Sequence, residues 1–173
     1  MTPANLQQLH DLGARAGELL RRRGEKIAVA ETSAGGLIAS SLLAVPGASA
    51  YFAGGAITYS ARAIRGLVGI STDEMRDRGI RSSSEPYAQL LAEAVRSRHG
   101  RIAWGLAETG AAGPDGNPYG DPAGHTCMAV TGPVNRVRTL RTGRSDRVAN
   151  MLAFATATLE LLIEALEAAP PTS

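Results

Sequence analysis

Apolar residues recur along this chain in two alternating patterns, one helical and one typical of buried strands. Leucine and alanine at helical spacing predict a first helix over residues 5–23, which ends at Gly24 after three arginines. The same spacing, or a capping residue before it, predicts further helices over residues 37–43, 60–67, a short stretch from 72, 85–98 and 147–167. Short apolar runs between turn residues predict strands at residues 26–30, 55–59, 102–107, 126–130 and 136–140.

The alternation of strands and helices predicts an α/β fold in which helices cover a mixed, mostly buried sheet. The 173 residues are expected to form a single domain, with a core over about residues 5–167 and a flexible tail over residues 168–173. Residues 108–123 are rich in glycine and proline and are expected to form a long loop. Long loops in compact domains are usually functional or disordered, so this loop is a candidate for part of a site.

Composition and charge narrow the classes of partner. The 18 basic and 16 acidic residues leave a net charge of +2, and aromatic residues make up 4% of the chain. This balance does not favour a nucleic-acid binder, which needs bulk positive charge or aromatic stacking surfaces. Lys26 is the one lysine in the sequence, so any mechanism that needs a lysine must use it.

Cysteine and histidine are scarce in the sequence. Cys127 lies in an apolar strand run and is expected in the core. Because it is the one cysteine of the sequence, an internal disulfide is excluded. The three histidines follow no metal-ligand spacing, so neither a metal nor another cofactor is expected. The first residues lack a signal-peptide pattern and no apolar run approaches the ~20 residues of a membrane span, which predicts a cytoplasmic protein without membrane contact.

Three polar segments, two of which contain glycine, follow the ends of predicted buried strands, at residues 31–36, 58–60 and 108–116. The carboxyl ends of strands in α/β sheets are where ligands bind, and the helix N-termini beyond them offer unpaired N–H groups to anions. Gly35 and Gly36 would let the backbone approach a phosphate closely. The alternative is that these segments are only strand–turn–helix connections, with Thr32 or Ser33 as a helix cap.

Several motifs occur in an order that is known from one protein family. The stretch VAETSAGGLIASSLLAVPGASAYFAGGAITYSARA is followed by SEP at residues 84–86, GAAGPDG at residues 110–116 and PAG at residues 122–124. This order resembles the C-terminal domain of the CinA (competence-damage-inducible protein) family, whose corresponding elements read AESCTGG, VPGSSAWF, TYSNEAK, SEP, GIAGPDG and PVG. The resemblance covers about residues 5–165, which is essentially the whole chain.

The resemblance implies a three-layer α/β/α domain, a homo-oligomer, and deamidation of nicotinamide mononucleotide, a step of pyridine nucleotide salvage in which a linear amide is hydrolysed to the acid and ammonia. It places the family's nucleophilic serine on Thr32, with Ser33 beside it as a substitute. The family's tyrosine and serine fall on Tyr59 and Ser60. The family's lysine falls on Ile64, whose side chain cannot accept a proton, so the chain resembles a divergent member with altered catalytic residues.

Other polar residues offer a different acid/base set. Glu31, Glu108 and His125 are all predicted near the same end of the sheet, where they could transfer protons. The alternative is that the two carboxylates cap helix or loop N–H groups and that His125 hydrogen-bonds the loop. The segment GRSDR at residues 143–147 corresponds to the family's late GDR motif in altered order, and the resemblance implies an arginine contact from Arg144 or Arg147.

These observations define the expected site. Its catalytic residues are Thr32, Ser33, Tyr59, Glu108 and His125. Its substrate-binding residues are Glu31, Ala34, Gly35, Gly36, Ser60, Thr109, Gly110, Ala112, Gly113 and Arg144. Residues 31–36, 58–60 and 108–125 should converge on one cleft that takes a small molecule, such as a phosphorylated nucleoside or a related metabolite.

Three functions are compatible with this expected site. The first is a hydrolase of the family type, a nicotinamide-nucleotide amidase. The second is a binding protein for a nucleotide or phosphorylated metabolite that has lost the chemistry. The third is an enzyme of the same fold that acts on another substrate through Glu31, Glu108 and His125.

Overall fold

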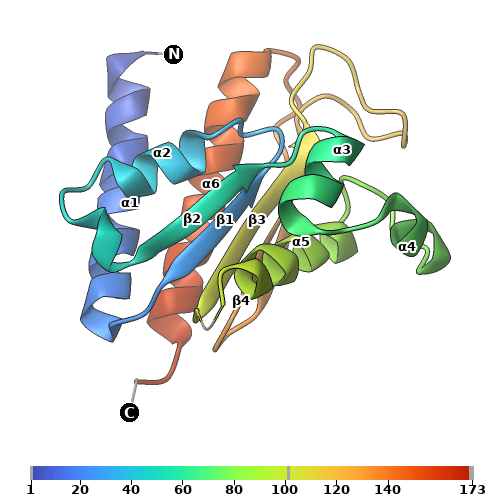
Figure 1. The fold of residues 1–173 in the computed structure, drawn as a ribbon. Coiled ribbons are helices and arrows are strands. Elements are labelled where there is room, and N and C mark those ends of the chain that lie inside the picture. Colours follow the sequence, from blue (N-terminus) through green and yellow to red (C-terminus); the bar gives the residue numbers. More distant parts are fainter. Residues whose placement is uncertain (1, 101, 172–173) are drawn as a thin grey trace.

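The computed structural model describes residues 2–100 and 102–171. Its centre is a mixed five-stranded sheet in the order β2-β1-β3-β4-β5 (Figure 1). The strands are β1 (Ile27–Glu31), β2 (Phe52–Ile57), β3 (Trp104–Ala111), β4 (His125–Thr131) and β5 (Arg136–Arg141). Strand β1 runs parallel to β2 and β3, whereas β4 runs antiparallel to β3 and β5. The carboxyl ends of β1, β2 and β3 therefore meet at one edge of the sheet.

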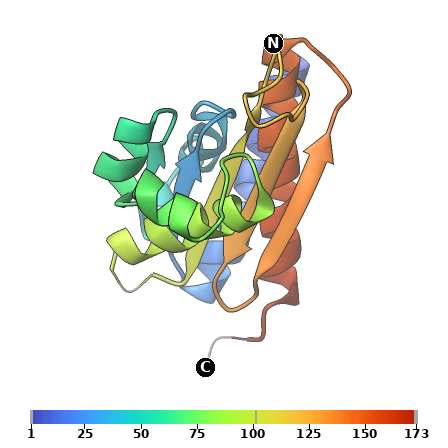
Figure 2. The ribbon, with the colours of Figure 1, turned by 90° about the vertical axis from the view of Figure 1, so that its right-hand side faces the viewer.

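Helices cover both faces of the sheet and make a three-layer α/β/α domain (Figures 1 and 2). One face carries α1 (Pro3–Arg23), α2 (Leu37–Leu43) and α6 (Arg147–Ala168). The other carries α5 (Glu85–Arg98), with α3 (Ala61–Ala63), the π-helical turn η2 (Ile64–Val68) and α4 (Thr72–Asp77) beside it. A 3₁₀ turn, η1 (Ala48–Ala50), precedes β2. A separate apolar core lies on each side of the sheet, which confirms the expected layered fold.

Local sequence signals explain most element boundaries. The Thr2 hydroxyl caps α1 at its start, and Gly24 ends it in the left-handed conformation, with φ of 63°. All five residues of β1 are buried, as a strand with helices on both faces requires. Cys127 is also buried, on β4, which confirms its expected place in the core.

Several predicted boundaries were wrong. Strand β2 spans Phe52–Ile57 and not residues 55–59, so Thr58 and Tyr59 follow the strand. Two further differences bear on the site. Strand β3 continues to Ala111, so Glu108, Thr109 and Gly110 belong to the strand and not to a loop, because they pair with residues of β4. The predicted helix over residues 60–67 is one α-helical turn followed by a π-helical turn. The connection that follows β3 is therefore shorter than expected, over residues 112–124.

The last helix, α6, is both long and apolar. By length and composition alone α6 could cross a membrane, contrary to the expectation that no run is long enough, but 56% of its most apolar window is buried inside the domain. It packs against α1, α2 and the sheet, as a core helix does. After it, the Arg23 guanidinium donates hydrogen bonds to the carbonyl oxygens of Ala169 and Pro170. Of the tail predicted to be flexible, residues 172–173 lie outside the described residues.

Candidate functional site

A cleft lies at the carboxyl ends of the parallel strands and consists of two adjoining lobes. The first, which we call the arginine lobe, has a volume of about 310 Å³ and is lined by Ser33, Tyr59, Arg147 and residues 110–118. The second, the hydroxyl lobe, has a volume of about 340 Å³ and is lined by Thr32, Ser33, Thr58, Tyr59, Ala61, Ile64, Thr72, Met75, Ser82, Ser83, Tyr87, Thr109, Gly110, Asn117 and Tyr119. Parts of the three strand-end segments, residues 32–33, 58–59 and 109–119, converge on this cleft, whereas the other residues of the expected segments line neither lobe.

The Glu31 carboxylate, at the end of β1, caps the N-terminus of α2. It is buried and accepts hydrogen bonds from the backbone N–H groups of Gly36 at 2.9 Å, Ile38 at 3.1 Å and Ala39 at 2.8 Å. Burial raises the pKa of Glu31, although these N–H donors favour its charged form. An anionic side chain at a helix N-terminus is a favourable arrangement, so Glu31 acts as an internal anion for α2.

The Glu108 carboxylate, on β3, satisfies the loop between β1 and α2. It is fully buried and accepts from the N–H groups of Thr32 at 3.2 Å and Ala34 at 2.8 Å and from the Thr126 hydroxyl at 2.7 Å. Burial, with a smaller contribution from the nearby Glu31, raises the pKa of Glu108 to about 7, against the hydrogen bonds from Ala34 and Thr126. Both carboxylates therefore hold the backbone of the loop, as the capping alternative describes.

Of the first glycine segment, only Thr32 and Ser33 line the cleft. Among the described residues, Glu31, Ala34, Gly35, Gly36 and Glu108 line neither lobe. The prediction that Gly35 and Gly36 bind a phosphate was wrong, because the Gly36 N–H already donates a hydrogen bond to Glu31. Both glycines have positive φ, of 65° and 100°, so the backbone turn and not a ligand accounts for them.

The two candidate nucleophiles differ in what their hydroxyl groups contact. The Thr32 hydroxyl donates to the Glu108 carbonyl oxygen at 3.3 Å. The Ser33 hydroxyl makes no hydrogen bond within the part of the chain that the structure describes, and Ser33 lies at the junction of the two lobes. Ser33 is therefore better placed than Thr32 to attack a bound ligand.

The arginine on the cleft is Arg147 and not Arg144. Arg147, at the start of α6, donates to the Gly113 carbonyl oxygen at 2.7 Å and to the Tyr59 hydroxyl at 3.1 Å. Arg144 is exposed and lines a separate hollow beside Arg141. Ser60, another expected binding residue, caps α3 by accepting the Ala63 N–H at 3.2 Å, and it lines neither lobe.

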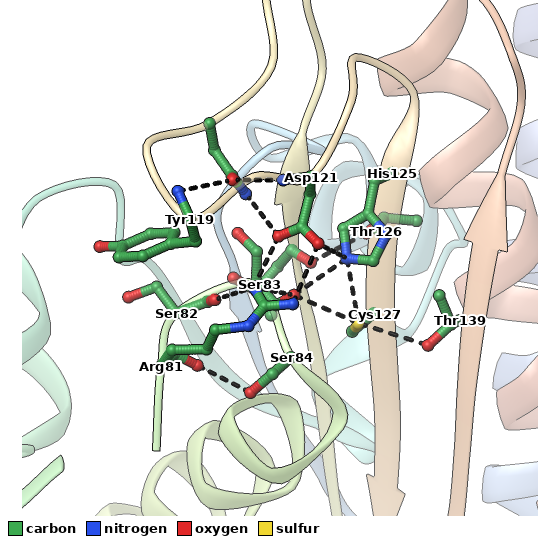
Figure 3. Close-up of polar contacts among 12 residues, drawn as sticks. Arg81, Ser82, Ser83, Ser84, Tyr119, Asp121, His125, Thr126, Cys127 and Thr139 are labelled. Carbon is green, nitrogen blue, oxygen red and sulfur yellow. Dashed lines mark hydrogen bonds and ion pairs between the residues drawn. The ribbon is translucent and has the colours of Figure 1, made fainter. Parts of the chain in front are cut away.

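His125 lies in a buried network behind the cleft and not on it (Figure 3). Its Nε2 is 2.9 Å from the Ser83 carbonyl oxygen and 3.6 Å from Asp121 Oδ1. His125, Glu31 and Glu108 thus each have structural partners and do not form an acid/base set on the cleft. The expected catalytic roles of Glu108 and His125 are corrected for this reason.

The same network pins the loop over residues 112–124 above the cleft (Figure 3). Arg81 donates to the two carboxylate oxygens of Asp121 at 2.6 and 3.0 Å, and the Asn117 amide donates to Asp121 at 2.9 Å. Burial alone would raise the pKa of Asp121, but the hydrogen bonds from Arg81 and Asn117 outweigh it and hold this pKa below its usual value. Asn117 and Tyr119 are thereby held on the cleft.

The remaining expected residues lie where they were predicted. Thr109, Gly110, Ala112 and Gly113 line the cleft, as does Tyr59. Sequence reasoning missed further lining residues, chiefly Thr72, Ser82, Ser83 and Tyr87. Three of these, Ser82, Ser83 and Tyr87, lie in or next to the SSSEP segment, which indicates only a helix start when it is taken by itself. Over the described residues, no three His, Cys, Asp or Glu side chains gather so as to hold a metal ion.

Comparison with known proteins identifies the family. The sequence matches the CinA C-terminal domain over residues 9–166. A "CinA-like protein" of Myxococcus xanthus is 42% identical over 158 residues, which are 90% of this chain and 36% of that protein. A "CinA-like protein" of Prochlorococcus marinus is 43% identical over 116 residues, which are 67% of this chain and 26% of that protein. The chain therefore matches about a third or less of these relatives' length.

Solved structures show the same fold. A CinA superfamily protein from Klebsiella pneumoniae 700603 matches with a TM-score of 0.83 and 25% identity, over 92% of this chain and 98% of that one. The competence/damage inducible protein CihA from Agrobacterium tumefaciens matches with a TM-score of 0.80 and 30% identity, over 92% and 96% of the two chains. From the family match, the identity to CinA-like proteins and the shared fold, the chain belongs to the CinA family.

Proposed function

We propose that this chain is an amidohydrolase that binds a pyridine mononucleotide or a related phosphorylated ribose in the cleft, with Ser33 as the attacking group. The observation that carries the proposal is the position of the Ser33 hydroxyl. It is free of hydrogen bonds to the described residues and lies where the arginine lobe and the hydroxyl lobe meet. A ligand that spans both lobes would pass directly over it.

The arginine lobe suits the phosphate of such a ligand. Arg147 supplies a permanent positive charge as a donor to an anion, and Asp115 is the one acidic side chain among the described residues that line this lobe. The glycine-bearing backbone from residue 110 to residue 116 allows close approach of an anion. In the reaction, the Ser33 oxygen would attack the amide carbon and form an ester, while the amide nitrogen takes up a proton and leaves as ammonia. Water would then hydrolyse the ester to the acid.

A second candidate function is binding of the same class of ligand without turnover. It is favoured by Ile64, which lines the hydroxyl lobe at the position where the family resemblance places a lysine. A serine hydroxyl is a weak nucleophile unless a neighbouring base activates it. Since Ile64 cannot accept the proton, the proton would pass to water, and hydrolysis by this chain is expected to be slow.

Nicotinamide mononucleotide, with calorimetry for binding and ammonia release for turnover, separates the two functions. We expect binding and slow release, with release abolished in Ser33→Ala and retained in the matched variant Thr32→Val. Release that is unchanged in Ser33→Ala would reject the proposed nucleophile. Binding without release selects the second function, and absence of binding rejects both.

Other expectations about this protein stay predictions. They are a cytoplasmic location, a small-molecule partner without nucleic acid or membrane contact, assembly into a homo-oligomer, and a reaction without a cofactor.

A further inference from the structure

The hydroxyl lobe is lined by uncharged side chains, whereas the arginine lobe is lined by two charged ones, Arg147 and Asp115. None of the described side chains that line it carries a charge at neutral pH. Its apolar surface comes from Ile64, Met75 and Tyr87. Arg81 and Asp121, which hold the loop that carries Tyr119, neutralise each other in an ion pair. A cationic ring placed in this lobe would lose water without gaining an opposite charge, which is costly.

Tyr87, which lines the hydroxyl lobe, carries a fully buried polar atom without a partner among the described residues. The Tyr87 hydroxyl is buried, Tyr87 is 1% exposed, and no described residue accepts from or donates to this hydroxyl. Buried hydroxyl groups in native proteins nearly always have a hydrogen-bond partner, and leaving one without a partner costs about 1–3 kcal/mol. Burial also raises the pKa of Tyr87, so the hydroxyl is a neutral donor that a ligand atom could satisfy.

An aromatic side chain also borders the lobe. Tyr119 lines it from the pinned loop and is 51% exposed, although both Asn117 and Asp121 hold the loop around it in place. An exposed tyrosine on a fixed backbone offers a flat face against which a ring can stack. Ile64 supplies apolar surface in the same lobe, where a lysine would have brought a positive charge.

From these observations we propose that the hydroxyl lobe takes an uncharged, flat nitrogen heterocycle, hydrogen-bonded by the Tyr87 hydroxyl, while the anionic part of the same ligand lies in the arginine lobe. This inference rests on the proposed function and specifies its substrate class. The chain would prefer a mononucleotide with a neutral ring over one with a pyridinium cation.

Two forms of one ligand test this preference. Reduced and oxidised nicotinamide mononucleotide share the amide, ribose and phosphate, but only the oxidised ring is charged. Calorimetry should show that the reduced form binds at least about tenfold more tightly. Tyr87→Phe, which removes a single oxygen atom, should weaken binding of the reduced form about tenfold, and Tyr119→Leu should weaken it as well.

The outcomes separate this inference from the proposed function. Equal affinity for the two forms, tighter binding of the oxidised form, or unchanged affinity in Tyr87→Phe would overturn the neutral-ring inference while leaving mononucleotide binding intact. Failure of both forms to bind would overturn the proposed function and the inference together. A thermal unfolding curve for Tyr87→Phe that matches or exceeds the wild type shows that any loss of affinity is not a loss of folding.

Discussion

Two glycine-bearing segments follow neighbouring parallel strands in this protein, yet they have different roles. The segment after β1, residues 32–36, has its backbone N–H groups bonded to the buried carboxylates of Glu31 and Glu108. In the segment from residue 112 to residue 116, no carboxylate of the described residues accepts from the backbone. That segment instead lines the cleft beside Arg147.

The difference shows what a glycine-rich sequence does and does not predict. Glycine permits a sharp turn and close approach of the backbone in both segments. Whether the exposed N–H groups then bind a ligand depends on whether the protein already supplies acceptors for them, since buried backbone groups are almost always paired. In the first segment the protein supplies its own anions, and in the second it leaves room for one.

The largest effect is expected from removing the anion of the first segment. Glu31→Ala leaves three backbone N–H groups without their acceptor, and we expect it to lower the free energy of unfolding by about 4 kcal/mol. Sulfate should raise the melting temperature of this variant more than that of the wild type, because the vacated N–H groups form an anion site.

The matched control is Glu18→Ala. Glu18 is an exposed glutamate on α1 that pairs with Arg22, and its loss should cost less than about 1 kcal/mol. Urea unfolding of the two variants, with and without sulfate, makes the comparison. Equal destabilisation of both would contradict the role that we assign to Glu31.

A smaller, pH-dependent effect is expected from Glu108. Its pKa is about 7 in the folded chain, against 4.5 for an unperturbed glutamate, so the folded state holds this proton more tightly than the unfolded state. The resulting stability is complete below about pH 4.5 and is lost as pH rises through 7. Relative to Glu108→Gln, the wild type should lose on the order of 2 kcal/mol between pH 5 and pH 8. Urea unfolding of both proteins at pH 5 and pH 8 measures this difference in the free energy of unfolding. The same change with pH in the wild type and in Glu108→Gln would contradict the prediction.

The smallest effect on stability, and a clear one on binding, is expected at the second segment. Arg147 is exposed, so Arg147→Ala should change the free energy of unfolding by no more than about 0.5 kcal/mol. It should weaken binding of nicotinamide mononucleotide about tenfold, because a charged hydrogen-bond donor is lost from the arginine lobe. Arg144→Ala is the control, and an equal loss of affinity there would show that general charge, not position, attracts the ligand.

Much of the fold could be predicted because its signals are local. Helical spacing and the caps around α1 and α5 are read within a few residues, and so is the apolar run of β1. The end of β3 could not be read in this way, since Glu108, Thr109 and Gly110 look like a polar loop. They are strand residues because they pair with β4, which follows in the sequence only after the connection over residues 112–124.

The candidate site shows the same difference between features set by local sequence and features set by tertiary contacts. By itself the sequence determined the layered α/β class, the bends that end the parallel strands, and the absence of a lysine at position 64. The tertiary structure alone decided that Glu108 accepts the N–H of Ala34. It also decided that the Thr32 hydroxyl is hydrogen-bonded whereas the Ser33 hydroxyl has no partner among the described residues. In the same way, it decided that Arg147 and not Arg144 reaches the cleft. Each of these outcomes depends on whether another element of the fold supplies a partner. Local propensity carries no information about such partners, because only packing of the sheet and helices brings them together.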